Sequence, residues 1–240
     1  MESDLVTGLH RVQRAQSVHN IAGKTREKSR STESETGFVC VIDDDTSIRE
    51  SLVDLLQSVG FDARGFETAA EILSKDFLKF ANCFIVDIRM PGVSGLDFQA
   101  HLKESKIQVP IVFVTGHADV PMTVQAMKAG AIDFLTKPFR EQEVLDAVAR
   151  AVALNNERIK CYLQISGAIA RYETLSARER EVMALVTAGL MNKQAAAKID
   201  IAISTVKTHR TQIMKKMGAR SLADLVRMAE LLQLKSPQEK

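Results

Sequence analysis

Short apolar segments alternate with longer amphipathic ones from residue 38 to about residue 160. Several of the short segments are apolar at nearly every position, which is typical of strands covered on both faces. Strands are expected at 38–42, 62–66, 83–87, 111–115 and 132–136, and helices at 47–59, 68–80, 95–105, 121–129 and from 141 onward. Strict alternation of strand and helix predicts an α/β domain with a five-stranded, parallel, doubly wound sheet.

The last third of the chain has helical spacing throughout. A capping box, in which Ser176 and Glu179 bond to each other's backbone, starts the first helix, and Gly189 ends it. A second helix is expected at 193–199, and a third from Ser204 or Thr205 to Met217, where Gly218 stops it. Two short helices joined by a tight turn, the second of them basic, indicate a small all-α helix-turn-helix domain.

This pattern divides the chain into four parts. Residues 1–36 are polar and of mixed charge, and we expect them to be disordered or weakly ordered. The α/β domain is expected at 37–150, a helical linker at 151–171 and the helix-turn-helix domain at 172–240.

The net charge of +2 conceals a difference between the two domains. Residues 37–150 hold 11 Lys and Arg against 17 Asp and Glu, a net charge of −6, whereas residues 172–240 hold 12 against 7, a net charge of +5. Two domains of opposite charge suggest different partners, and the basic one is the candidate for binding a polyanion.

Composition excludes several other classes of protein. No apolar run reaches about 18 residues, so no membrane contact is expected, and the N-terminus lacks the apolar core of a secretory signal. Three cysteines, widely spaced, do not suggest a disulfide framework or a zinc site. These features predict a cytoplasmic protein.

Carboxylates follow two of the expected strands. Asp43 and Asp44 come directly after 38–42, and Asp87 ends 83–87. If these strands are neighbours, their carboxyl ends meet at the edge where doubly wound sheets bind ligands. Three carboxylates repel one another there unless a cation joins them, and oxygen ligands of this kind suit Mg²⁺. The sequence therefore predicts a magnesium site.

The next two strands end in groups that suit phosphoryl chemistry. The fourth ends in the hydroxyl of Thr115 and the fifth in the ammonium of Lys137. A carboxylate can act as a nucleophile, and a metal and an ammonium can neutralise the developing charge. A lone strand-end Asp is more often a cap, and Asp45 is assigned that role, with Thr46 or Ser47 as rivals. The combination at four strand ends indicates phosphoryl transfer.

Four motifs, FVCVIDDD, IVDIRMPGVSG, IVFVTGHADVPMTVQAMKAGAIDFL and TKPF, resemble the receiver domain of two-component response regulators, a flavodoxin-like fold. The resemblance implies that Asp87 accepts a phosphoryl group and that Lys137, before a cis Pro138, pairs with it. It implies Mg²⁺ held by Asp43, Asp44, Asp87 and the backbone carbonyl of Arg89. It also implies a switch pair, Thr115 and Phe134.

The basic helix has two faces at about 100° per residue. Val206, Ile213 and Met217 fall on one side, which should be core. The opposite side is basic and hydroxylic, and is expected in the major groove of DNA. It carries Lys207, Thr208, Thr211 and Lys215. A solvated face without a partner is the alternative for an isolated helix, but the preceding helix-turn and the positive charge favour DNA.

Three further motifs, LSARERE, GLMNKQAA and ISTVKTHRTQIMKKMGARS, resemble the LuxR-type helix-turn-helix. The resemblance places Lys207, Thr208 and Thr211 near base edges. It implies that contacts to the DNA backbone, or support of the domain as scaffold residues, come from Lys193, Thr205, His209 and Arg210. Together the two domains resemble the NarL/FixJ class of transcriptional regulators, nearest its FixJ-like branch.

This resemblance implies a transcription factor that is switched by phosphorylation. A sensor histidine kinase would phosphorylate Asp87, and the homodimer would bind promoter DNA and act with RNA polymerase. The protein would not be an enzyme beyond phosphotransfer and self-dephosphorylation. One alternative is a haloacid-dehalogenase-like phosphatase. That class carries an Asp two residues after its nucleophile, and Arg89 at this position disfavours it. The other alternative is a phosphorylation-dependent interaction protein without a DNA target.

Overall fold

The computed structural model describes residues 37–73, 78, 80–116 and 119–234. The expectation for 1–36 lies outside these residues. The chain folds as two compact units, the first comprising Met1–Arg158 and the second Ile159–Lys240. Among the helices that the structure describes, none has the length and apolarity of a membrane span.

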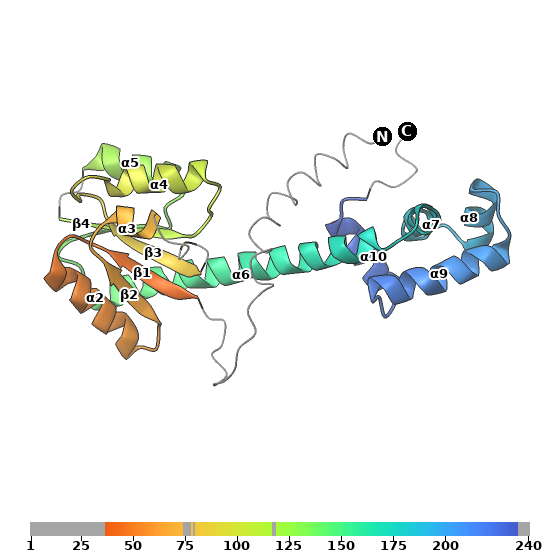
Figure 1. Cartoon of the computed structure of the whole chain (residues 1–240), viewed down its shortest axis with the longest axis horizontal. Coiled ribbons are helices and arrows are strands. Elements are labelled where there is room, and N and C mark those ends of the chain that lie inside the picture. The colour runs from red at the N-terminus through yellow and green to blue at the C-terminus, as the bar shows by residue number, and fades with distance from the viewer. Residues whose placement is uncertain (1–36, 74–77, 79, 117–118, 235–240) are drawn as a thin grey trace. The chain divides into compact units, whose positions relative to one another are not determined.

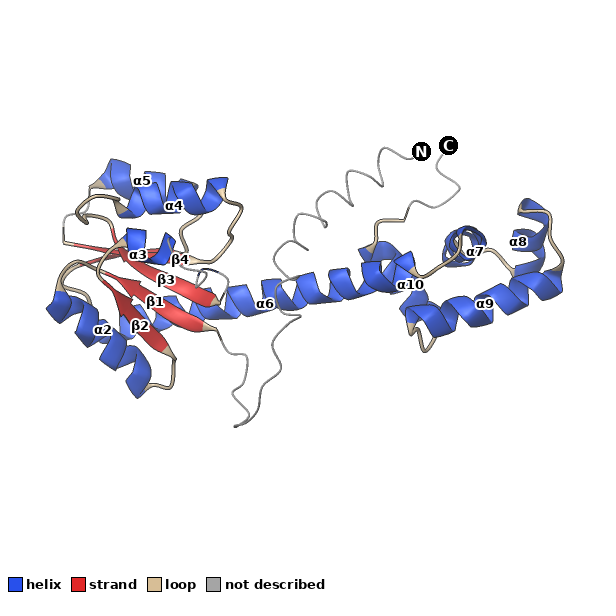
Figure 2. Ribbon diagram, viewed as in Figure 1, coloured by secondary structure: helices blue, strands red, loops and turns tan. Residues whose placement is uncertain are grey.

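The first unit contains a five-stranded sheet in which every neighbouring pair is parallel (Figures 1 and 2). The strands are β1 (Phe38–Ile42), β2 (Ala63–Phe66), β3 (Ala81–Asp87), β4 (Ile111–Thr115) and β5 (Asp133–Thr136), in the spatial order β2-β1-β3-β4-β5. The connecting helices are α2 (Thr46–Ser58), α3 (Ala69–Leu73), α4 (Gly95–Glu104) and α5 (Val120–Lys128), and α6 (Glu141–Glu173) follows β5. The predicted α/β fold class is confirmed.

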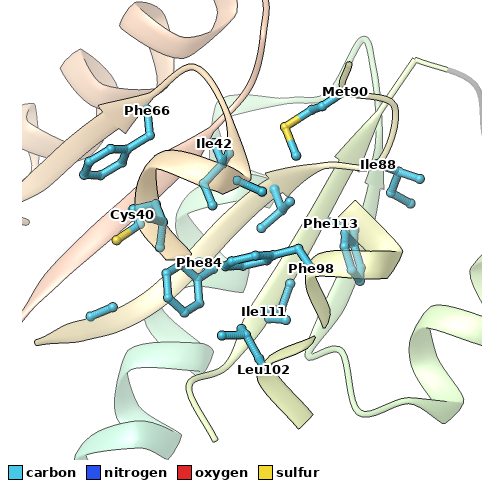
Figure 3. Packing of buried hydrophobic residues seen from close by; sticks show 14 of the residues in the cluster. Cys40, Ile42, Phe66, Phe84, Ile88, Met90, Phe98, Leu102, Ile111 and Phe113 are labelled. Carbon is cyan, nitrogen blue, oxygen red and sulfur yellow. The ribbon is translucent and has the colours of Figure 1, made fainter. Parts of the chain in front are cut away.

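Each face of the sheet is buried by helices, which explains why β1, β3 and β4 are apolar at nearly every position. On one face, Phe84 of β3 packs edge-on against Phe98 of α4, with ring centroids 5.2 Å apart (Figure 3). Such aromatic pairs stabilise a fold by about 0.5–1.5 kcal/mol beyond the area they bury. On the other face, Val39, Ile85 and Val112 lie in one cluster with side chains of α2 and α6.

The expected bounds of two helices, 68–80 and the helix after Asp45, can be compared with the structure. The segment expected to be helical over 68–80 forms a described helix only at Ala69–Leu73, and the residues after it up to Phe80 are only partly described. Asp45 caps α2 as expected, because its carboxylate accepts hydrogen bonds from the N–H groups of Ser47 and Ile48. The rival caps, Thr46 and Ser47, lie inside the helix.

The second unit contains the end of α6 and four helices. These are α7 (Ala177–Thr187), α8 (Asn192–Lys198), α9 (Ile203–Met217) and α10 (Leu222–Leu231). The predicted capping box is present, with Ser176 and Glu179 bonded reciprocally. Gly218 has a φ of 68° and ends α9, as glycine does in this left-handed conformation. The expected start of α9 at Ser204 or Thr205 is wrong by one or two residues, since the helix begins at Ile203.

Candidate functional site

The three carboxylates predicted to meet at the edge of the sheet do so. Strands β1 and β3 are parallel neighbours in which Ile42 lies opposite Val86, so the residues that follow these two, Asp43 and Asp87, are level. One oxygen from each of Asp43, Asp44 and Asp87 lies within 4.8 Å of the others. Asp43 and Asp87 are buried, whereas Asp44 is exposed.

Lys137 supplies the positive charge in this cluster. It follows β5, and its backbone N–H donates to the carbonyl of Thr115 on β4. Its Nζ lies 2.7 Å from Asp43 Oδ2 and 2.8 Å from Asp87 Oδ2. The Lys137–Pro138 peptide is cis, as the resemblance implied. Residues from the ends of three strands therefore form one ionic cluster.

Burial changes the acid–base properties of the cluster. Removal from water raises the pKa of Asp43, and the hydrogen bond from Lys137 opposes that rise without cancelling it. Burial alone would lower the pKa of Lys137, but its hydrogen bonds to Asp43 and Asp87 outweigh this effect and raise it. The ammonium is thus firmly charged at neutral pH, and it compensates the two buried carboxylates.

Backbone and side-chain donors fix the orientation of the carboxylates. The N–H of Asp45 donates to Asp43 Oδ1, and the N–H of Arg89 donates to Asp87 Oδ1, each over 3.0 Å. Arg49, one turn into α2, donates a hydrogen bond to the carbonyl oxygen of Asp43 at a distance of 2.6 Å. Arg49 carries no signal in the sequence, because no motif marks an arginine that reaches back to a main-chain carbonyl.

Gly95 allows α4 to begin directly beside the acidic cluster. A Cβ at this position would lie 2.5 Å from the carbonyl oxygen of Asp87 and 3.0 Å from the Cα of Ile88. The N–H of Gly95 donates to the carbonyl of Ile88 over 3.0 Å. Only a residue without a side chain fits this close approach.

The two residues of the expected switch pair occupy different environments. Thr115, at the end of β4, is fully buried. Phe134, in the middle of β5, is half-buried, and its ring centroid lies 6.4 Å from that of Phe113. β4 and β5 are adjacent parallel strands, in which Phe134 lies opposite Phe113 and Thr136 lies opposite Thr115.

The acidic cluster has the donor chemistry of a site for a hard divalent cation. Its three carboxylates come from two strand ends, which the sheet brings close together. Mg²⁺ binds through one or two carboxylates and keeps several water ligands, and the exposure of Asp44 leaves one side of the cluster open for them.

The second unit presents the predicted face of α9 to solvent. Val206, Ile213 and Met217 are buried in the core of this unit. The opposite face carries the exposed Lys207, Thr208, Thr211 and Lys215. The hydroxyls of Thr208 and Thr211 donate to carbonyls of the preceding helical turn.

The other residues of the expected DNA surface are placed less uniformly. Lys193 and Thr205 are exposed and His209 is half-buried. Arg210 donates a hydrogen bond to Asn192 Oδ1 at a distance of 2.6 Å, which links α9 to the start of α8.

An ion pair between α9 and the start of α7 links a buried carboxylate to a partly exposed lysine in the second unit. Lys216 of α9 donates to Glu179 Oε2 over 2.6 Å, and the same oxygen accepts from the N–H of Ser176. The hydrogen bond from Lys216 and then that from Ser176 hold the pKa of Glu179 below its usual value. The capping box marked Glu179 in the sequence, but nothing local identified its partner 37 residues away.

Comparisons with known proteins agree with both units. Residues 39–149 match the family described as the response regulator receiver domain, and residues 173–229 match the bacterial regulatory proteins of the luxR family. Nodulation protein W of Bradyrhizobium diazoefficiens is 50% identical over 84% of this chain and 89% of its own length. The transcriptional regulatory protein FixJ of Rhizobium meliloti is 40% identical over 80% and 94%, respectively. The solved structure of the response regulator StyR is 46% identical, with a TM-score of 0.74 over 80% of this chain and 98% of that one.

Proposed function

Because this chain belongs to the response regulators that join a receiver domain to a LuxR-type DNA-binding domain, we propose that a sensor histidine kinase switches it by placing a phosphoryl group on Asp87. The chain is thus a phosphorylation-dependent transcriptional regulator. Both families are regulatory, which argues against the phosphatase alternative.

The position of Lys137 between Asp43 and Asp87 is the observation that carries this proposal. Asp87 ends β3 at the open edge of the sheet, where one of its oxygens, Oδ1, is held by the N–H of Arg89 and the other, Oδ2, by Lys137. A carboxylate oxygen of Asp87 attacks the phosphorus of a phosphohistidine. The P–N bond breaks, its electron pair returns to the imidazole, and an acyl phosphate forms. Lys137 then pairs with the new phosphoryl oxygens.

Asp43, Asp44, Asp87 and the backbone carbonyl of Arg89 would hold Mg²⁺. When bound, Mg²⁺ neutralises charge on the transferring phosphoryl group. The protein orients Asp43 for this role. The N–H of Asp45 holds its carboxylate, and Arg49 holds its main-chain carbonyl.

Phosphorylation is read out by the second unit. Thr115 moves toward the phosphoryl group and Phe134 follows it, which biases the surface of the receiver toward a homodimer. A dimer presents two copies of α9 to two half-sites of promoter DNA, where RNA polymerase acts. Lys207, Thr208 and Thr211 lie near base edges, and Lys215 belongs to the same face in the major groove. Contacts to the DNA backbone or support of the helix come from Lys193, Thr205, His209 and Arg210.

The direct test is labelling with acetyl phosphate and Mg²⁺. Asp87→Asn should abolish the label and the phosphorylation-dependent shift of a DNA duplex selected from a random-sequence pool. Asp45→Asn is the matched control, since Asp45 carries a carboxylate close by that caps α2, and it should keep the label. A label that persists in Asp87→Asn would place the acceptor elsewhere.

A further inference from the structure

Strand β3 contains a β-bulge at the end opposite Asp87. Phe38 pairs with Ala81 and Val39 pairs with Cys83, so Asn82 is the extra residue between them. A bulge re-aims the side chain of the extra residue. The amide nitrogen of Asn82 donates to the carbonyl of Gly37 over 2.8 Å, and its oxygen accepts from Asn155 Nδ2 over 3.1 Å.

Asn155 is the last residue of α6 to be buried against the first unit. The residues of α6 that face the sheet before it are small and apolar: Val144, Ala147, Val148 and Ala151. Asn155 continues this row and is 2% exposed, whereas residues 156–164 are all exposed. The Asn82–Asn155 hydrogen bond therefore lies at the point beyond which α6 is no longer buried against the sheet of the receiver.

The pair is poorly suited to a purely stabilising role. Asn155 Oδ1 is buried and has no hydrogen-bond partner among the described residues. Apolar side chains at both positions 82 and 155 would avoid that cost, since replacing both partners of a buried hydrogen bond by apolar groups can be nearly neutral in stability. A row of valine and alanine, however, permits small rotations and shifts, and a single buried asparagine is known to specify register in packed helices. The surroundings are also tight, because a Cβ on Gly37 would lie 2.7 Å from Asn82 Oδ1.

Helix α6 and the loop just before it bond to β3 near the two ends of that strand. Lys137 precedes α6 by a few residues and bonds to Asp87 at the carboxyl end of β3. Asn155 bonds to Asn82, which lies five residues, or roughly 16 Å of extended strand, nearer the amino end. A change at Asp87 that alters the first attachment leaves the second as the point about which the helix is held.

We propose that Asn82 and Asn155 are a positioning pair, which fixes the rotational setting of α6 where the helix leaves the receiver and so couples the state of Asp87 to DNA binding. The coupling half rests on the function proposed above, whereas the positioning half does not.

The positioning half is tested by distance measurement between two spin labels in the full-length chain. Glu50→Cys on α2 and Glu157→Cys on α6 are both exposed sites in the first unit. Cys161, the exposed native cysteine, is changed to serine. Cys40 and Cys83 stay unlabelled, since both are fully buried and burial raises the pKa of Cys40 to about 12 and that of Cys83 also.

In this background Asn155→Leu should broaden or shift the distance distribution. Asn156→Leu is the matched control, because it makes the same change at the next, exposed residue of the helix. Should Asn155→Leu fail to fold, Asn82→Ser is the second variant, because its shorter side chain cannot reach Asn155, and it should broaden the distribution as well. Distributions identical to that of Asn156→Leu would overturn the proposal.

The coupling half is tested by the affinity for a duplex selected from a random-sequence pool, measured before and after phosphorylation by acetyl phosphate. Asn155→Leu should accept the label as the unsubstituted chain does, but its gain in affinity on phosphorylation should fall by about two- to tenfold. An undiminished gain would overturn the coupling. If phosphorylation failed to change the affinity of the unsubstituted chain, the proposed function would fail, and the distance measurement would still decide the positioning.

Discussion

Lys137 Nζ lies 2.8 Å from Asp87 Oδ2, although the two residues are 50 positions apart in the chain. The same nitrogen lies 2.7 Å from Asp43 Oδ2, which is 94 positions away. Two buried carboxylates at the end of a hydrophobic sheet are unfavourable without a cation, and this ammonium provides one. Lys137 therefore both compensates the charge of the two buried carboxylates and places an ammonium beside Asp87.

Lys137→Met should destabilise the first unit and impair phosphorylation. Two buried carboxylates would lose their counter-charge, so the free energy of unfolding without Mg²⁺ should fall by about 1–3 kcal/mol. Added Mg²⁺ should restore part of this loss, and acetyl phosphate labelling should slow by at least about tenfold. Thermal unfolding with and without Mg²⁺ measures the first effect. Lys128→Met, an exposed lysine of α5, is the control, and equal behaviour of the two variants would contradict the role of Lys137.

Gly95→Ala should disturb the acidic cluster through a backbone clash. The new methyl group would lie 2.5 Å from the carbonyl oxygen of Asp87, which must move to relieve the contact. We expect a loss of about 1–3 kcal/mol in the free energy of unfolding and slower labelling of Asp87. Gly167→Ala, in α6, meets no atom within 4 Å and should instead be neutral or slightly stabilising. A fully active Gly95→Ala variant would show that the helix start can shift freely.

Glu179→Gln should destabilise the second unit in a pH-dependent manner. The folded protein lowers the pKa of Glu179, so its contribution is present above the unfolded pKa of about 4.3 and is lost as the pH falls through the lower, folded value. At pH 7 the variant should lose about 1–2 kcal/mol, because Lys216 is partly exposed and water screens the pair. The difference from the unsubstituted chain should shrink below about pH 4.

Tyrosine fluorescence can follow this unfolding selectively. The chain has no tryptophan and two tyrosines, Tyr162 and Tyr172, both within the second unit. A difference in stability that stays constant from pH 7 down to pH 3 would contradict the assignment to the Glu179 carboxylate.

Lys207→Ala should weaken DNA binding by about 1–3 kcal/mol if the side chain reads a base, and the loss should depend on the base pair at one position of the site. A lysine that contacts only phosphate would instead weaken all sequences equally and lower the slope of affinity against salt by about one. Arg227→Ala removes one positive charge from α10 and is the control for net charge. Titration of selected and scrambled duplexes at several salt concentrations separates these outcomes.

The secondary structure and the residues of the acidic cluster could be predicted because their signals are local. Continuous apolar segments predicted β1, β3 and β4. The carboxylates at the ends of β1 and β3 predicted the acidic cluster. The capping box at Ser176 and Glu179 and the glycine that ends α9 were also readable, since each motif spans a few residues. The helix expected over 68–80 is described at Ala69–Leu73, and most of the positions after it lie outside the described residues.

By itself, the sequence determined which strands exist, which face of α9 is apolar, and that Asp43, Asp44, Asp87, Thr115 and Lys137 belong at strand ends. Only the tertiary structure decided which side chains actually touch. Arg49 on the Asp43 carbonyl, Lys216 on Glu179 and Asn155 on Asn82 join residues whose partners depend on strand order, a β-bulge and helix packing. Hydrogen bonds and ion pairs act over about 3 Å, so they form only after the hydrophobic core has brought distant segments together, and local patterns carry no record of them.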